Sequence, residues 1–165
     1  SLTEDAVEGY NTNAKMNPPL RTAEDVEFLK DAVRDGTIDL VATDHAPHHY
    51  DEKEREFSDA PNGIIGLETA LAVLVTNLVE PGIISYATLV DRMSCAPARI
   101  FHLPGGSLRR GSVADITVFD PAARWTVEPA TFLSKGRNTP YAGMPLRGRA
   151  TCTIVGGRIV YRLAG

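Results

Sequence analysis

Hydrophobic and polar residues near the start of the chain follow first a helical and then an extended pattern. Val26, Leu29 and Val33 recur on one helix face, after a Thr-Ala-Glu-Asp segment that is typical of a helix N-terminus. Residues 38–43 (IDLVAT) form a β-prone run, and a polar loop that contains Pro47 follows it. A helix, a tight turn, a strand and a loop in this order predict an α/β fold.

The middle of the chain favours helices, and its last part favours strands. The expected helices are residues 66–79, 86–93 and 97–101. The expected strands are residues 114–120, 151–155 and 158–161. Gly156 and Gly157 separate the last two strands and predict a two-residue hairpin turn. Because the sequence pattern changes from helix-favouring to strand-favouring at Pro104, we expect one part in residues 1–104 and a small β part in residues 105–165.

Composition narrows the classes of protein. The 165 residues are 43% hydrophobic with a formal net charge of -4, which suits a globular chain with a buried core. We expect no nucleic-acid or membrane partner, since like charges form no block and the apolar run 71–79 is too short to span a bilayer. Two distant cysteines favour a reducing, cytoplasmic location. Without an initiator Met or a signal peptide, we expect a start inside a longer chain.

The segment with the most chemical potential is residues 42–49 (ATDHAPHH). In a barrel of alternating strands and helices, the end of a strand and the loop after it face the active-site mouth, so Asp44 and His48 would share one rim. A carboxylate there can bind a divalent metal and accept a proton from metal-bound water. From spacing alone, the segment fits either a metal or catalytic site or a capped strand end with surface histidines.

Several separated segments resemble dihydroorotases of the amidohydrolase superfamily, in the same order. They are residues 15–21 (KMNPPLR), 42–48 (ATDHAPH), 60–71 (APNGIIGLETAL), 97–101 (PARIF) and 134–141 (SKGRNTPY). The resemblance covers nearly all of the chain. Hydantoinases and allantoinases share the barrel, but their counterparts of the first two segments differ, so the resemblance favours dihydroorotase.

The resemblance implies a role for five residues. Asp44 is the strand-end carboxylate that binds the more exposed metal ion and moves a proton between the hydrolytic water and the ring nitrogen. His48 holds the substrate carboxylate, and Asn17 contacts the pyrimidine ring. The backbone groups of Asn62 and Gly63 hydrogen-bond the amide atoms of that ring.

The resemblance also implies a fold, a reaction and partners. Residues 1–104 are expected to be the C-terminal part of a (β/α)8 TIM-type barrel, and residues 105–165 a small β-sandwich appendage. The reaction is the reversible, metal-dependent cyclisation of N-carbamoyl-L-aspartate to (S)-dihydroorotate in pyrimidine biosynthesis. One or two Zn2+ ions take their other ligands upstream, so we expect the isolated chain to be inactive. The expected partners are a second copy, in a homodimer, or aspartate transcarbamoylase.

Two other functions remain open at this stage. The chain could belong to a non-catalytic, dihydroorotase-like subunit that serves assembly with another pyrimidine enzyme. It could also belong to a hydantoinase-like or allantoinase-like cyclic amidohydrolase. Asp44, Asn17 and His48 favour the catalytic alternatives, because a purely structural subunit has no need of these side chains at a barrel mouth.

Overall fold

The computed structural model describes residues 1–163, which pack as two compact units. The first unit consists of Ser1–Lys30, Thr43–Ala70 and Thr126–Leu146. The second unit consists of Asp31–Ala42, Leu71–Trp125 and the chain from Arg147 onward. These units group segments that touch one another. The division into residues 1–104 and 105–165 concerns folding domains and stays a prediction.

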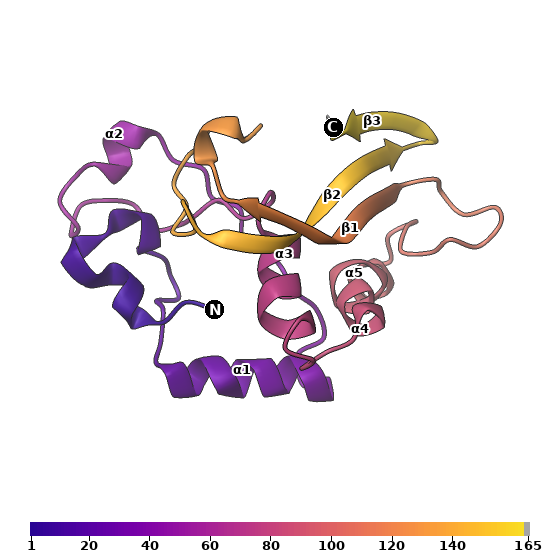
Figure 1. The fold of residues 1–165 in the computed structure, drawn as a ribbon, viewed down its shortest axis with the longest axis horizontal. Coiled ribbons are helices and arrows are strands. Elements are labelled where there is room, and N and C mark those ends of the chain that lie inside the picture. The colour runs from indigo at the N-terminus through magenta and orange to yellow at the C-terminus, as the bar shows by residue number, and fades with distance from the viewer. Residues whose placement is uncertain (164–165) are drawn as a thin grey trace. The chain divides into compact units, whose positions relative to one another are not determined.

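The predicted N-terminal helix is confirmed as α1, Ala23–Asp35 (Figure 1). Thr22 caps it in a reciprocal way: its Oγ1 accepts from the Asp25 amide (3.3 Å), and its own amide donates to the Asp25 carboxylate (3.1 Å). Hydrogen bonds from the Thr22 side chain and backbone lower the pKa of Asp25. This capping explains why the helix begins where the sequence predicts.

The predicted helices in the middle of the chain are also present, with π-type turns inserted. They are α3 (Ala70–Leu74) with a π-helix at Val75–Val79, α4 (Tyr86–Val90) with a π-helix at Asp91–Cys95, and α5 (Ala96–Ile100). Buried apolar side chains of this second unit form its core: Val33, Val75, Leu78, Ile84 and Leu89. The short helix α2 (Tyr50–Lys53) and the 3-10 helices Glu4–Tyr10 and Thr12–Ala14 belong to the first unit.

A three-stranded sheet confirms the predicted strands of the last part. Its strands are β1 (Ile116–Thr126), β2 (Pro145–Val155) and β3 (Arg158–Arg162), with β2 in the centre (Figure 1). Strands β2 and β3 are antiparallel, and Val155 pairs with Arg158 across the predicted two-residue turn. Gly156 and Gly157 both have positive φ angles, 54° and 77°, as a type I′ hairpin turn requires.

Residues 38–43, which the sequence predicts as a strand, form no strand within residues 1–163. The segment is extended, but a strand exists only through hydrogen bonds to a neighbouring strand. Here the Val41 amide donates to the Arg92 carbonyl oxygen (3.1 Å), which lies at a π-type helical turn and not in a strand. Residues 15–21, which resemble a closing barrel strand, likewise form no strand within residues 1–163. None of the helices found there has both the length and the apolar composition needed to cross a bilayer.

Candidate functional site

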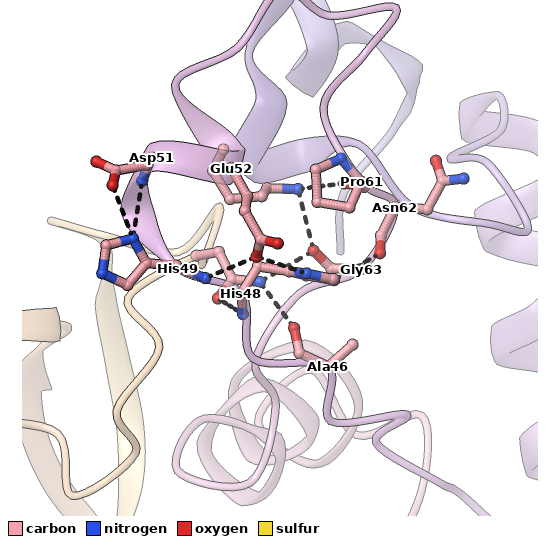
Figure 2. A network of polar contacts seen from close by, with 10 residues as sticks. Ala46, His48, His49, Asp51, Glu52, Pro61, Asn62 and Gly63 are labelled. Atoms are coloured by element: carbon pink, nitrogen blue, oxygen red, sulfur yellow. Dashed lines mark hydrogen bonds and ion pairs between the residues drawn. The ribbon is translucent and has the colours of Figure 1, made fainter.

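Two loops of the first unit form the framework of the candidate site. The Ala46 amide donates to the Ile64 carbonyl oxygen (2.9 Å), which joins the loop after Thr43 to the loop before Gly66. The His48 ring Nε2 lies 3.0 Å from the Asn62 carbonyl oxygen. Since a carbonyl oxygen only accepts, this ring nitrogen carries the proton. Figure 2 shows the contact between His48 and Asn62, with Gly63 beside it.

Gly63 lies where the two loops approach each other closely. Its φ angle is +123°, and a Cβ built there would lie 2.6 Å from the Ala46 Cβ and 3.3 Å from the His48 Nε2. Its amide donates to the Lys15 carbonyl oxygen (3.0 Å), which brings the segment before Asn17 against the same loop. Both the backbone conformation and the close approach therefore require glycine at this position.

Two lysines hold the loop that carries Asn62 and Gly63. Lys53 is 5% exposed, and its ammonium group donates to the carbonyl oxygens of Pro61 (2.9 Å) and Gly63 (3.2 Å). Lys15 donates to three more carbonyl oxygens, of Phe57, Ser58 and Ala60. Burial, and next the charge of Lys15, lower the pKa of Lys53. These two side chains satisfy backbone oxygens that no helix or sheet pairs.

The helix α2 is fixed beside His48 by a capping box. The His49 ring Nδ1 accepts from the Asp51 amide (3.3 Å), and the Glu52 carboxylate accepts from the His49 amide (3.1 Å). This backbone hydrogen bond lowers the pKa of Glu52, whose carboxylate also lies 3.6 Å from the Nδ1 of His48. The two ring nitrogens of His48 thus have different neighbours: Nε2 contacts Asn62, and Nδ1 lies near Glu52 (Figure 2).

Asp44 is exposed and has a positive φ angle of 44°, a conformation that is uncommon for a non-glycine residue. Its neighbour His45 anchors the loop, because Nδ1 of His45 accepts from the amides of Gly66 (3.2 Å) and Leu67 (3.4 Å). The Nε2 of His45 then carries the proton and lies 3.4 Å from the Ser134 hydroxyl. Within residues 1–163, the Asp44 carboxylate accepts no hydrogen bond, so it is free for solvent or a ligand.

The structure joins three of the five predicted site residues through short contacts. His48 contacts the Asn62 carbonyl oxygen, and the Asn138 side chain bonds both the His48 amide and the Gly63 carbonyl oxygen, so these residues form one group. Asn17 is exposed like Asp44, and no hydrogen bond in the described chain links either of them to that group. A pocket of about 350 Å³ adjoins the group; its lining is Tyr10, Thr12, Asn13, His48, Tyr50, Lys53, Glu54, Arg55, Arg137 and Asn138.

The comparison with known protein families decides the family. The model of the amidohydrolase family matches residues 10–160. The chain belongs to the amidohydrolase family. This amidohydrolase chain is 58% identical over 162 residues to the dihydroorotase of Geobacter metallireducens, and 55% identical over 161 residues to that of Trichlorobacter lovleyi. Each match covers 98% of the chain but 38% of the relative, so the chain spans well under half the length of these relatives.

Solved structures of other amidohydrolases have a similar fold. The L-hydantoinase (dihydropyrimidinase) of Arthrobacter aurescens matches with a TM-score of 0.91 and 33% identity, over 99% of this chain and 38% of that one. The dihydropyrimidinase of Brevibacillus agri matches with a TM-score of 0.90 and 28% identity, over 98% of this chain and 37% of that one. The described part of this amidohydrolase is thus a partial amidohydrolase fold of mixed α/β type, with a small antiparallel sheet.

Several residues that shape the candidate site in this amidohydrolase escaped the sequence reasoning. Lys53 stands in a charged run, residues 51–55, which a pattern of charges favours as a solvated helix face. Asn138 stands in the segment 134–141, which carries a family resemblance but no chemical pattern of its own. The unusual feature of both residues is burial, since Lys53 is 5% and Asn138 3% exposed. The local sequence around a polar residue does not indicate that its side chain is buried.

Proposed function

We propose that the polypeptide containing this chain is a dihydroorotase. It would catalyse the reversible cyclisation of N-carbamoyl-L-aspartate to (S)-dihydroorotate. The observation that carries this proposal is the identity of 54% to 58% to proteins named dihydroorotase over nearly the whole chain. The small separation of His48, Asn62 and Gly63 supports it, because these residues are those expected to contact the substrate.

We further propose that residues 1–104 are the last strands and helices of a (β/α)8 barrel and that residues 105–165 form the small β-sandwich domain. The TM-score of 0.91 with a hydantoinase supports the first part. On this proposal residues 15–21 and 38–43 would pair with barrel strands contributed by other parts of the polypeptide. That pairing would place both segments in a strand ladder, which neither has within residues 1–163.

In the proposed site, Asp44 moves a proton between the hydrolytic water and the ring nitrogen, and Asn17 contacts the ring. His48 holds the substrate carboxylate. Asn62 and Gly63 contact the amide atoms of the ring through their backbone groups. Gly63 already uses its amide toward Lys15 and its carbonyl toward other side chains, so a substrate contact there requires an exchange of hydrogen bonds.

The proposed metal is Zn2+, with Asp44 as one of its ligands. The residues described do not fit this ion by themselves, because no group of three His, Cys, Asp or Glu side chains gathers among residues 1–163. A catalytic zinc takes three protein ligands. The remaining ligands would come from elsewhere in the polypeptide. Asp44 would contribute its carboxylate, which is exposed at the end of an extended segment.

The remaining features of the proposal concern location and assembly. We propose a cytoplasmic protein that acts on a small molecule, without a nucleic-acid or membrane partner. Homodimer formation and association with aspartate transcarbamoylase are proposed on the resemblance alone. Both can be tested by the mass of the full-length protein in solution, with and without added aspartate transcarbamoylase.

The proposed reaction is tested by Asp44→Ala in the full-length polypeptide. Removing the proton-transfer group should lower kcat for dihydroorotate hydrolysis by about 10³-fold. The Tm should change little, because the Asp44 side chain is exposed and accepts no hydrogen bond within residues 1–163. Asp59→Ala, at an exposed aspartate of the same unit with no proposed role, is the control and should retain activity. Near-normal turnover in Asp44→Ala would reject the assignment.

A hydantoinase-like activity is the second candidate, because the solved structures with the TM-scores quoted above are hydantoinases or dihydropyrimidinases. Their identities of 33% and 28% are well below the 58% found for a dihydroorotase. Steady-state assays of the full-length protein with both cyclic amides separate the two candidates. Hydrolysis of hydantoin without hydrolysis of dihydroorotate would establish the second.

A further inference from the structure

One buried amide connects the two loops of the candidate site. The Asn138 side-chain oxygen accepts from the His48 amide (3.1 Å). Its side-chain nitrogen donates to the carbonyl oxygens of Ala46 (2.8 Å) and Gly63 (3.1 Å). Asn138 is 3% exposed, so these bonds are shielded from water. A single side chain therefore fixes the distance between the loop of His48 and the loop of Asn62 and Gly63.

The chemistry of this position is specific to an amide. The group must accept once, from an N–H, and donate twice, to two carbonyl oxygens, and only a primary amide does this within the length of one asparagine. A carboxylate of the same shape keeps the acceptor but places negative charge against two carbonyl oxygens. Alanine leaves the His48 amide and the Ala46 carbonyl oxygen without their partner, whereas the Gly63 carbonyl oxygen keeps Lys53. Unpaired polar groups are costly in a buried site.

The segment that carries Asn138 is itself tied down on both sides. The Glu68 carboxylate accepts from the consecutive amides of Leu133 (2.9 Å) and Ser134 (3.0 Å). Gly136 packs so closely on the loop of His48 that a Cβ built at Gly136 would lie 2.8 Å from the Pro47 Cβ. The Asn138 backbone oxygen accepts from the Ile65 amide (3.0 Å), which adds a second bond to the Gly63 loop. Asn138 thus reaches the two loops from a fixed base.

We propose that Asn138 is a positioning residue for substrate binding: it holds His48 and the backbone of Asn62 and Gly63 at the separation that the substrate requires. This inference rests on the proposed function, since it assumes that those residues contact substrate. It assigns a role in the site to residues 133–138, which belong to the expected β appendage of residues 105–165. Asp44 is not among the groups that Asn138 touches, so the proton-transfer step is not affected directly.

The kinetic test uses Asn138→Asp in the full-length polypeptide. We expect KM for dihydroorotate to rise about tenfold, as the loss of two buried hydrogen bonds would give, with less than about a threefold change in kcat. The control is Asn77→Asp, which makes the same chemical change at an amide that donates to the Val73 carbonyl oxygen (2.7 Å) within the helical core of the second unit. It should lower the Tm and leave KM unchanged.

A second measurement needs no substrate. In Asn138→Ala, the amides of Ala46, His48 and residues 62–65 should exchange hydrogen with solvent about tenfold faster than in the unsubstituted protein, whereas those of residues 70–79 should keep their rates. Unchanged exchange in the two loops would overturn the inference. So would a KM that stays constant in Asn138→Asp while the Tm falls, because a purely structural role predicts that result.

The two measurements also separate this inference from the proposed function. If the unsubstituted protein does not turn over dihydroorotate, the proposed function fails, and the exchange rates still decide whether Asn138 positions the two loops. If the unsubstituted protein is active and neither KM nor exchange responds to the substitutions, the role of Asn138 fails and the proposed function stands.

Discussion

Gly63→Ala is the substitution for which the structure gives the most detailed expectation. The new methyl group would lie 2.6 Å from the Ala46 Cβ, a separation that carbon atoms do not tolerate, and 3.3 Å from the His48 Nε2. The loop of Ala46 and His48 would have to move away from the loop of Gly63. That movement would lengthen the contact between His48 and the Asn62 carbonyl oxygen, which is now 3.0 Å.

The expected free-energy change has two parts. A non-glycine residue held at a φ angle of +123° is strained by roughly 1–3 kcal/mol. Forcing a methyl group into a packed contact costs roughly another 1–3 kcal/mol, in part relieved if the loops separate. We therefore expect Gly63→Ala to lower the free energy of unfolding by roughly 2–6 kcal/mol.

Gly143→Ala provides a matched control for the backbone strain without the packed contact. Gly143 belongs to the same unit and has a positive φ angle of +75°, but no atom lies within 4 Å of a Cβ built there. Its substitution should cost only about 1–2 kcal/mol of backbone strain. The difference between the two variants then measures the contact between the loops.

The assay combines thermal unfolding of the full-length protein with steady-state kinetics on dihydroorotate. We expect a lower Tm for Gly63→Ala than for Gly143→Ala, and a raised KM for Gly63→Ala only. Equal Tm values for the two variants, together with an unchanged KM, would refute the reasoning. The close approach of Gly63 to Ala46 would then have no energetic consequence.

Two further predictions concern parts of the fold away from the site. Leu89 is 1% exposed in the core of the second unit, so Leu89→Ala should destabilise the protein by about 2–5 kcal/mol, whereas Leu67→Ala, at a side chain that is 65% exposed, should stay within about 0.5 kcal/mol in denaturant titrations. Thr22→Ala should lower the Tm by removing the side-chain cap of α1 and the side-chain hydrogen bond that contributes most to the lowered pKa of Asp25. A carboxylate with a lowered pKa stabilises the fold above its ordinary pKa. The Tm difference between Thr22→Ala and the unsubstituted protein should therefore be largest near neutral pH and shrink as the pH falls through the folded-state pKa of Asp25. A Tm difference that does not depend on pH would contradict this.

The elements that could be predicted from sequence are those whose signals are local. The cap of α1 needs only Thr22 and Asp25, three residues apart, and the hairpin needs only Gly156 and Gly157 between two β-prone runs. Residues 38–43 show the limit of such signals. Their β propensity is real, but a strand also needs a neighbour, and propensity says nothing of whether one is present.

The candidate site was predictable only as far as its motifs carried a resemblance. Asp44, His48 and Asn62 stand in recognisable segments, but the positive φ angle of Asp44 and the close approach at Gly63 depend on tertiary contacts. The three backbone groups that bond the Asn138 side chain belong to residues 75 to 92 positions away along the chain. No local pattern in residues 134–141 indicates which carbonyl oxygens this amide will meet.

The way in which the site loops are held explains why they are sensitive to single side chains. In a helix or sheet, each backbone hydrogen bond is supported by its neighbours, and the loss of one side chain leaves the ladder intact. The loops of His48 and Gly63 have few such bonds, and their separation depends on Asn138, Lys53 and the missing side chain of Gly63. A change at any of these three positions should therefore alter substrate binding while the helices and the sheet persist. This follows because the same atoms that order the loops also set where their polar groups face the substrate.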